Sequence, residues 1–216
     1  MTPINLFTTY YNDPVPSRQA ELDFCIRKNL EIGFNTVTIL IEDKDLSCFE
    51  ANIGNLEKVN LVKVSSRPTF NNFFSCISQD NAINIIANSD IFFPDLNSIR
   101  SFYTGRNDAT NVCLALSRWD YFSDGSSNHF NREDSQDTWV FYGKPNFVAS
   151  HDFCMGVAGC DNRLAYDLAV AGFNLLNPSK SIKTLHYHQT NVRHYLDQTG
   201  QVKERVSPPY KLIQPY

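Results

Sequence analysis

A chain of 216 residues, 42% of them hydrophobic and 19% charged, is long and apolar enough to fold as one globular domain with a substantial core. A net charge of −4 argues against a broad nucleic-acid surface, and no apolar run reaches the roughly 18 residues needed to span a bilayer. We therefore expect no nucleic-acid partner, no membrane span and no signal peptide, and we expect a cytoplasmic protein.

The six cysteines predict reduced thiols rather than a disulfide framework. No two of them have the two-residue spacing of a zinc knuckle or a redox dithiol, and several stand inside apolar segments. A free cysteine in such a place packs as a small hydrophobe, which is its usual state in a cytosolic protein.

The first part of the chain alternates strand-like and helix-like segments. A helix is expected to begin with Ser17 as its N-cap and to end near Gly33, and a shorter helix is expected within 43–57. Runs rich in β-branched residues predict strands at 4–11, 36–41 and 59–64. This order predicts a parallel sheet with right-handed crossovers.

The next helix is predicted to begin at Thr69, which follows a proline and is a common N-cap residue. Asn72 falls in its first turn, where side-chain amides and free backbone N–H groups can meet a nucleotide or a phosphate. A purely local role at the start of the helix is the alternative for Asn72.

A continuous apolar run begins at residue 83 and has the pattern of a strand buried on both faces. It stops at Asn88-Ser89-Asp90, and Pro94 prevents a simple continuation. An Asp at the carboxyl end of such a strand stands where open α/β sheets bind their ligands, and one carboxylate there can hold a divalent cation that holds a diphosphate. Capping of the following turn is the alternative role for Asp90.

The second part of the chain continues the alternation. Helices are expected at 95–103 and from about 162 to Ala171, and strands at 112–116, 138–142, 173–176 and 182–188. The polar segment 123–136 has no such pattern, so we predict a mobile lid. Phe130 is its one large apolar residue, and Arg132 is the cation in it that could reach a phosphate.

His186 and His188 stand two residues apart on a predicted strand, so both side chains should face the same side. A neutral imidazole with a carboxylate and phosphate oxygens suits Mn²⁺ better than a purely oxygen site does. Arg193 follows closely and could clamp a diphosphate with its guanidinium. Structural hydrogen bonds for the histidines and a solvated surface position for Arg193 are the alternatives.

Three of these features together resemble the nucleotide-sugar-dependent glycosyltransferases of the GT-A fold: Asn88-Ser89-Asp90 ending a central strand, 156–162 opening a late helix, and His186-Tyr187-His188 near the end. The resemblance implies an α/β fold: a single-domain, GT-A-like (Rossmann-like), mixed, mostly parallel sheet flanked by helices. It also implies a single domain over 1–216, with a nucleotide-binding half at about 1–95, an acceptor-binding half at about 96–195, and an extended tail at 196–216.

In that family an Asp-x-Asp motif binds a divalent metal and the sugar nucleotide, and a C-terminal His often completes the metal site. The resemblance thus implies Mn²⁺ or Mg²⁺ held by Asp90, His188 and His186, with His188 preferred of the two. The partners implied are a UDP- or GDP-sugar donor and a glycan or other hydroxyl acceptor. Asn88 replaces the first Asp of the motif, and it is expected to contact the nucleotide together with Asn72 and Arg193.

Asp161 is expected both to cap the late helix and to act as the general base on the acceptor hydroxyl. Asp137 and Asp120 are rival bases. Trp119 and Trp139 each adjoin one of these acids, and aromatic faces beside carboxylates commonly hold sugar rings. Packing in the core is the alternative for both tryptophans.

The leading hypothesis is a metal-assisted glycosyltransferase. A catalytically silent nucleotide- or glycan-binding domain of the same fold is the alternative, which Asn88 in place of the first Asp and the short length favour. A sugar nucleotidyltransferase is a third hypothesis, but such enzymes usually carry a Gly-rich basic loop after the first strand, and 8–17 has no glycine.

Overall fold

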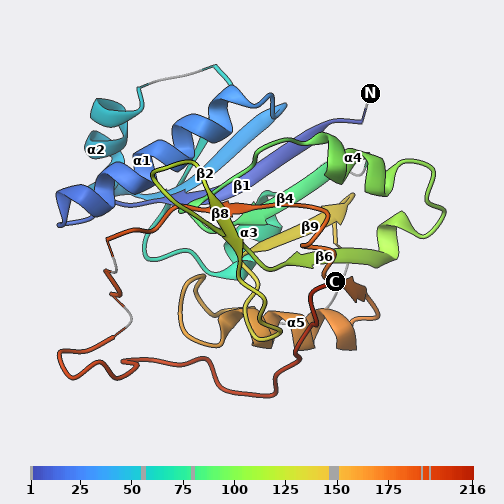
Figure 1. Ribbon diagram of the computed structural model, residues 1–216. Coiled ribbons are helices and arrows are strands. Elements are labelled where there is room, and N and C mark those ends of the chain that lie inside the picture. The colour runs from blue at the N-terminus through green and yellow to red at the C-terminus, as the bar shows by residue number, and fades with distance from the viewer. Residues whose placement is uncertain (1, 55–56, 79–80, 146–150, 191, 195) are drawn as a thin grey trace.

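The computed structural model describes every residue except 1, 55–56, 79–80, 146–150, 191 and 195 (Figure 1). Its centre is a seven-stranded sheet in the order β10-β6-β9-β4-β1-β2-β3. Only β9 runs antiparallel to its neighbours β4 and β6, and the other adjacent strands are parallel. The strands of this sheet are β1 (Ile4–Tyr10), β2 (Thr36–Glu42), β3 (Val59–Val64), β4 (Ile83–Ala87), β6 (Val112–Leu116), β9 (Thr138–Tyr142) and β10 (Asn174–Leu176). The predicted mixed, mostly parallel α/β sheet is confirmed.

Strand β4 occupies the middle of this sheet, as the apolar run predicts. All five of its residues are buried, and it pairs with β1 on one edge and with β9 on the other. The strand ends before Asn88, whose backbone N–H donates to the carbonyl of Asp137 at 3.1 Å. Asp90 therefore follows the carboxyl end of the central strand.

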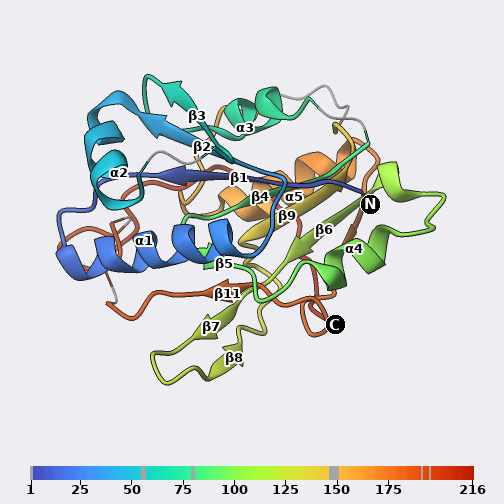
Figure 2. The same cartoon turned by 90° about the horizontal axis from the view of Figure 1, so that it is seen from above.

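Helices cover both faces of the sheet (Figure 2). Side chains from α1, α2 and α4 join one hydrophobic cluster with the strands, and side chains from α3 and α5 join another on the opposite face. The helices are α1 (Pro16–Glu31), α2 (Leu46–Asn52), α3 (Phe70–Cys76), α4 (Asn97–Tyr103) and α5 (Cys160–Val170), with short 3₁₀ turns η1 (Asp43–Asp45) and η2 (Ala109–Asn111).

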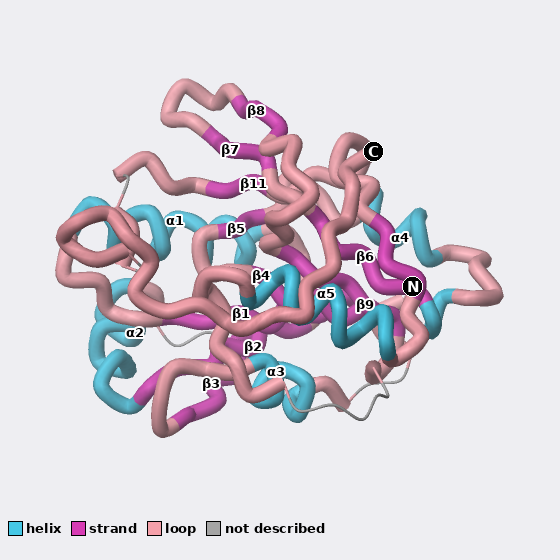
Figure 3. Tube along the Cα trace, turned by 90° about the horizontal axis from the view of Figure 1, so that it is seen from below, coloured by secondary structure: helices cyan, strands magenta, loops and turns pink. Residues whose placement is uncertain are grey.

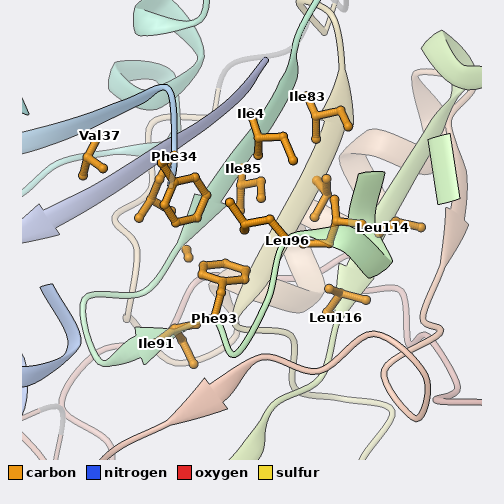
Figure 4. Packing of buried hydrophobic residues seen from close by; sticks show 14 of the residues in the cluster. Ile4, Phe34, Val37, Ile83, Ile85, Ile91, Phe93, Leu96, Leu114 and Leu116 are labelled. Atoms are coloured by element: carbon orange, nitrogen blue, oxygen red, sulfur yellow. The ribbon is translucent and has the colours of Figure 1, made fainter. Parts of the chain in front are cut away.

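Alternation along the strands explains these two clusters, because successive side chains of a strand point to opposite faces. Ile85 of β4 belongs to the α1 side, whereas its neighbour Ile86 belongs to the α3 side. Figure 4 shows Ile85 together with Phe93 and Leu96, which follow β4 and close the core on the α1 side. The chain that carries Asp90 is thereby anchored to the core at both ends.

A smaller four-stranded sheet in the order β5-β11-β7-β8 lies next to α1 (Figure 3). Its strands are β5 (Ile91–Phe92), β7 (Trp119–Tyr121), β8 (Ser127–His129) and β11 (Leu185–His186). Because β5 starts directly after Asp90 and β11 contains His186, the antiparallel pairing of these two strands brings the two residues together.

The segment 123–136 differs from the prediction. Residues 127–129 form β8, which pairs antiparallel with β7. The prediction that this segment has no secondary structure of its own is therefore wrong at these residues. Phe130 packs with its ring centre 4.0 Å from the guanidinium carbon of Arg118, and Arg132 pairs with Asp134. Pairing with β7 gives the backbone N–H and C=O groups of β8 hydrogen-bond partners, which the polar composition of the segment did not predict.

Two predicted N-caps are also wrong. Helix α1 begins at Pro16 after Val15 rather than at Ser17, because proline already has the φ of a first helical turn. Helix α5 begins at Cys160 with Gly159 as its N-cap, and Gly159 has a φ of 80° that glycine adopts without strain. Asp161 consequently lies inside the first turn.

Apart from a turn at 197–200 and isolated bridges, the tail 196–216 is extended, and it runs along α5 (Figure 1). The N–H of Lys211 donates to the carbonyl of Asn162, and the N–H of Ile213 donates to the carbonyl of Glu133. The Ile213 side chain is buried in the cluster beneath α5. These contacts fasten the tail to both α5 and the segment 123–136.

All six cysteines are free, as predicted. Among the described residues, no helix is both long enough and apolar enough to cross a membrane.

Asn29 offers a test of how the Asp90 region is held. Its buried side chain donates to the carbonyl of Ile91 at 2.8 Å and accepts from the N–H of Phe93 at 3.2 Å. Asn29→Ala leaves both backbone groups without these partners, so we expect a loss of about 2–3 kcal/mol in the free energy of unfolding, measured by chemical denaturation. The exposed Lys28→Ala on the same helix should change it by less than about 0.5 kcal/mol. Equal losses in the two variants would contradict this role.

Candidate active site

A cleft of about 1010 Å³ lies at the carboxyl ends of β1, β2 and β4, where open α/β sheets bind ligands. A smaller cleft of about 370 Å³ shares Arg118, His186, His188 and Arg193 with it and also includes Asp120. Eight of the residues that the sequence singled out line the larger cleft: Asn88, Asp90, Asp137, Trp139, Asp161, His186, His188 and Arg193.

Asp90, His186 and His188 come together as a group that could hold a metal ion. One ligand atom from each lies within 4.8 Å of the others. The Asp90 Oδ2 atom is 3.2 Å from Nε2 of His186 and 3.7 Å from Nδ1 of His188. Both imidazoles thus lie on the same side of the chain, as their spacing predicts, although only His186 belongs to the strand β11.

A third group at Asp90 is Arg18 of α1. Its Nη2 atom lies 2.6 Å from the same Oδ2 atom, and its Nη1 atom lies 2.9 Å from Glu21. Burial works to raise the pKa of Asp90, but His186 and Arg18 outweigh it and hold that pKa well below its usual range. Asp90 is therefore a carboxylate at every pH at which the protein would work.

The two histidines have opposite electrostatic surroundings. Burial favours neutral His186, yet the carboxylates of Asp90 and Asp120 raise its pKa above the usual value. Burial lowers the pKa of His188 to about 4, and the nearby guanidinium groups of Arg18 and Arg193 act in the same direction. His188 is thus neutral near pH 7, the form in which imidazole binds a metal.

The donor set of one carboxylate and two imidazoles fits a divalent ion such as Mn²⁺. The ligand atom that His188 would offer is Nδ1, because this nitrogen is the one that faces Asp90. Arg18 contacts the Asp90 oxygen, and Arg193 donates to Nδ1 of His188 at 2.8 Å. A cation at these atoms requires both guanidinium groups to turn away.

Asn88, the residue in place of the first motif Asp, faces another acid. Its Nδ2 donates to Oδ1 of Asp137 at 2.8 Å, while Arg118 binds Oδ2 of the same carboxylate at 3.0 Å. Arg118 also pairs with Asp120 at 2.9 Å, and Asp120 in turn contacts Nδ1 of His186 at 3.0 Å. Burial raises the pKa of Asp120, but His186 and Arg118 bring it down to about 2.

Asp161 lies at the start of α5 and has no cation paired with it among the described residues. Its carboxylate accepts from the N–H groups of Asn162 at 2.9 Å and of Gln136 at 3.3 Å. Burial, followed by the charge of Asp137, raises the pKa of Asp161 to about 6. A carboxyl with that pKa, lining a cleft, has the properties of a general base near neutral pH.

The two tryptophans differ in burial. Trp139, on β9, is 1% exposed and packs in the cluster on the α3 side, although part of its surface borders the larger cleft. Trp119 is only partly buried and borders neither cleft, and its Nε1 donates to the carbonyl of Ser179 at 2.7 Å. Packing in the core thus describes Trp139, and contact of either tryptophan with a sugar stays a prediction.

Asn72 lies outside both clefts. Its Oδ1 accepts from the backbone N–H of Thr69 at 2.9 Å, which is the return bond of a capping box at the start of α3. Its position outside the clefts and this hydrogen bond favour the local role of Asn72 at the start of α3 over contact with a nucleotide.

Three residues at the cleft escaped the sequence analysis: Arg18, Arg118 and Asp45. Each of these arginines has one carboxylate partner nearby in the chain, Glu21 for Arg18 and Asp120 for Arg118. Their other partners, Asp90 and Asp137, are 72 and 19 positions away, so local spacing does not place either arginine at the cleft. Asp45 follows β2, is 3% exposed, and its Oδ2 has no hydrogen-bond partner among the described residues. The turn after a second parallel strand is the signal that could have identified it.

Comparison with models of known families gives no match, and neither does comparison with curated protein sequences. Solved structures do match. The mannosyltransferase PcManGT of Pyrobaculum calidifontis, in complex with GDP-Man and Mn²⁺, is similar at a TM-score of 0.56 and 13% identity over 90% of this chain. TarS 1–349 of S. aureus is similar at a TM-score of 0.57 and 9% identity over 86% of this chain.

A third similar structure, from Bacillus anthracis, is assigned as a glucose-1-phosphate thymidylyltransferase, with a TM-score of 0.51 and 8% identity over 82% of this chain and 87% of that one. The chain spans 59% of the mannosyltransferase and 60% of TarS 1–349. The fold is GT-A-like. At these identities the similarity establishes this fold, which glycosyltransferases and nucleotidyltransferases share, and not a reaction.

The Asn88 position gives a direct test of the GT-A-like site. Asn88→Asp would replace a donated hydrogen bond to Asp137 with two facing carboxylates. We expect this variant to be less stable than Asn88→Ala by about 1–2 kcal/mol at pH 8, measured by chemical denaturation. The alanine variant loses the same bond without the added charge. If the Asp variant is as stable as the wild type, Asn88 does not serve to accommodate Asp137.

Proposed function

We propose that the protein transfers a sugar from a nucleoside diphosphate sugar to a hydroxyl acceptor with the help of a divalent metal. The observation that carries the proposal is the group of Asp90, His186 and His188 in a large cleft at the carboxyl end of the central strand. Such a strand end is where α/β sheets bind nucleotides. The similar mannosyltransferase structure, which contains GDP-Man and Mn²⁺, supports the same class of donor and metal.

Asp90, His186 and His188 would hold the metal, either Mn²⁺ or Mg²⁺. The two imidazoles favour Mn²⁺, because Mg²⁺ prefers oxygen ligands and retains several waters. When bound, the metal supplies charge that stabilises the diphosphate as it leaves the sugar. Arg18 and Arg193 now occupy the ligand atoms, and in the donor complex their guanidinium groups would turn to the diphosphate oxygens.

The donor is a UDP- or GDP-sugar in this proposal. Asp45 would accept from an N–H or hydroxyl group of the nucleoside, because its buried Oδ2 lines the cleft without a protein donor among the described residues. Asn88 lines the same cleft, where its amide donates to Asp137 at 2.8 Å.

The acceptor is a glycan or another molecule with a reactive hydroxyl. Asp161 would take the proton of that hydroxyl while its oxygen attacks the anomeric carbon, and the bond from that carbon to the diphosphate oxygen breaks with its electrons on the diphosphate. Asp137 and Asp120 remain rival bases. Asp161 is favoured because both rivals are already paired with Arg118.

A catalytically silent nucleotide- or glycan-binding domain is the second candidate. The pairing of Arg18 with Asp90 favours it, since a buried guanidinium already neutralises the carboxylate that would hold the metal. A sugar nucleotidyltransferase is less well supported, because the segment 8–17, from the end of β1 to the start of α1, contains no glycine to approach a triphosphate closely.

Nucleotide binding should depend on metal through Asp90. Calorimetry with UDP and with GDP should show an affinity that rises at least tenfold when Mn²⁺ replaces chelator. Asp90→Asn keeps the shape of the side chain and should abolish most of that rise, because the carboxylate is lost. The exposed Asp108→Asn, outside the clefts, should bind as the wild type does.

Equal binding in Mn²⁺ and in chelator would contradict the metal site. Metal-dependent binding without hydrolysis or transfer for any of a panel of UDP- and GDP-sugars would favour the silent domain.

Asp161→Asn should lower turnover by about 100-fold or more while leaving nucleotide affinity unchanged, because a general base acts only in the chemical step. Wild-type kcat/KM should rise as pH increases through about 6, the pKa of Asp161, since the base is active only when deprotonated. Steady-state kinetics from pH 4.5 to 8 would show this as a slope that the variant lacks. If turnover survives, the base lies elsewhere, and Asp137→Asn is the next variant to measure.

The same substitution has a stability readout. The pKa of Asp161 is raised in the folded protein, so folding stability falls as pH rises from about 4 to about 6, and it stays lower above that range. The amide of the Asp161→Asn variant does not titrate, and any change in hydrogen bonding is a constant offset. The free energy of unfolding of this variant minus that of the wild type should therefore grow by about 2–3 kcal/mol between pH 4 and pH 8. If this difference in the free energy of unfolding is constant with pH, the pKa of Asp161 is not raised in the folded protein.

A further inference from the structure

The arginines that line the larger cleft differ in whether they have a carboxylate partner. Arg18, Arg118 and Arg132 each form an ion pair with an Asp carboxylate. Arg67 and Arg205 also line the cleft, but neither side chain forms a hydrogen bond or an ion pair with any residue in the described part of the chain. Arg193 has no carboxylate partner either, but it donates to His188. In a protein with a net charge of −4, the two cleft arginines that lack any hydrogen-bond or ion-pair partner among the described residues call for an explanation.

Both of these arginines belong to segments that contact one loop, 156–159. The Nη2 atom of Arg67 lies so close to Gly156 that a Cβ there would be 2.6 Å from it. Gly156 has a φ of 75°, so glycine both fits the backbone and leaves room for the guanidinium. On the other side, Arg205 forms a parallel bridge with Ala158, and the following residue, Val206, donates its N–H to the Ala158 carbonyl at 2.9 Å.

The loop leads directly to the proposed base. Gly159 is the N-cap of α5, and Asp161 lies in the first turn. Arg67 and Arg205 are therefore placed on the acceptor side of the cleft. The groups proposed for the donor diphosphate, Arg18 and Arg193, contact Asp90 and His188 instead.

We propose that the acceptor carries an anionic group, a phosphate ester or a carboxylate, and that Arg67 and Arg205 bind it beside the loop 156–159. A guanidinium presents a planar fork of donors that matches the oxygens of either anion. The positions of both arginines would set acceptor specificity, with the anion held at the loop and the hydroxyl directed to Asp161. This inference rests on the proposed function, because it assumes that the loop before Asp161 faces the acceptor.

Binding of small probes tests the proposal without knowledge of the natural acceptor. The protein is saturated with Mg²⁺ and with UDP or GDP, whichever binds more tightly, and is titrated by NMR with glycerol 3-phosphate, with glucuronate, and with glycerol and glucose as neutral counterparts. We expect measurable binding of at least one anionic probe and much weaker binding of its neutral counterpart. Comparison of the two anionic probes distinguishes a phosphate ester from a carboxylate as the preferred group.

Arg67→Gln and Arg205→Gln should each weaken binding of the anionic probe by about five- to tenfold, since each substitution removes an exposed charged contact. Arg67→Lys should restore part of the loss, because it keeps the charge without the fork. Arg106→Gln removes an equal charge outside the cleft and should have no effect. These side chains are exposed or paired at the surface, so circular dichroism should show folded proteins throughout.

Unchanged probe binding in both glutamine variants would overturn the proposal, as would equal binding of neutral and anionic probes. A loss of nucleotide affinity as large as the loss of probe affinity would assign the two arginines to the donor instead, and would also overturn it. Failure of the proposed function is distinguishable, because it appears as absent binding of both UDP and GDP in the wild type. Titration of glycerol 3-phosphate without nucleotide then shows whether the arginine-dependent anion site stands by itself.

Discussion

The pairing of Asp90 with Arg18 is the interaction on which the rest of the site depends. Asp90 follows the central strand β4, Arg18 comes from α1, and His186 comes from β11 of the smaller sheet, so one carboxylate oxygen connects three parts of the fold. Both charged side chains are largely buried, at 13% and 5% exposure. Desolvation of such a pair is costly, and the additional contacts to Glu21 and His186 are what compensate for it.

A second arrangement of charge lies across the cleft and explains the departure from the Asp-x-Asp pattern. Asp137 would repel another carboxylate at position 88, and Asn88 instead donates a hydrogen bond to it. Arg118 neutralises Asp137 and Asp120, whereas the Asp161 carboxylate accepts from two backbone N–H groups and pairs with no cation among the described residues. The charge of Asp137 adds to burial in raising the pKa of Asp161 to about 6. Under the proposed function, this difference would separate charge stabilisation by the paired acids from proton transfer by Asp161.

The features that could be predicted from the sequence are those that local pattern determines. The largely apolar run of β4, interrupted only at Asn84, specified a central strand, and the spacing of His186 and His188 specified a shared side. Features that depend on tertiary contacts could not be predicted: Arg18 reaches Asp90 across 72 positions of the chain. The role of Asp161 as N-cap could not be predicted correctly either. The helix begins two residues earlier than predicted, because Gly159, with its positive φ, is the N-cap.

The choice between a transferase and a silent binding domain reduces to what neutralises Asp90 when a nucleotide is present. A guanidinium and a divalent ion compete for the same oxygen, and a nucleotide diphosphate attracts both. If the diphosphate draws Arg18 and Arg193 toward itself, it exposes Oδ2 of Asp90 and Nδ1 of His188 together, because these are the two atoms that the arginines contact. Donor and metal would then bind cooperatively, each removing an obstacle to the other. If Arg18 keeps its ion pairs with Asp90 and Glu21, the site binds a nucleotide through arginines alone, and the metal has no place. The geometry around one carboxylate oxygen therefore sets the boundary between the two functions.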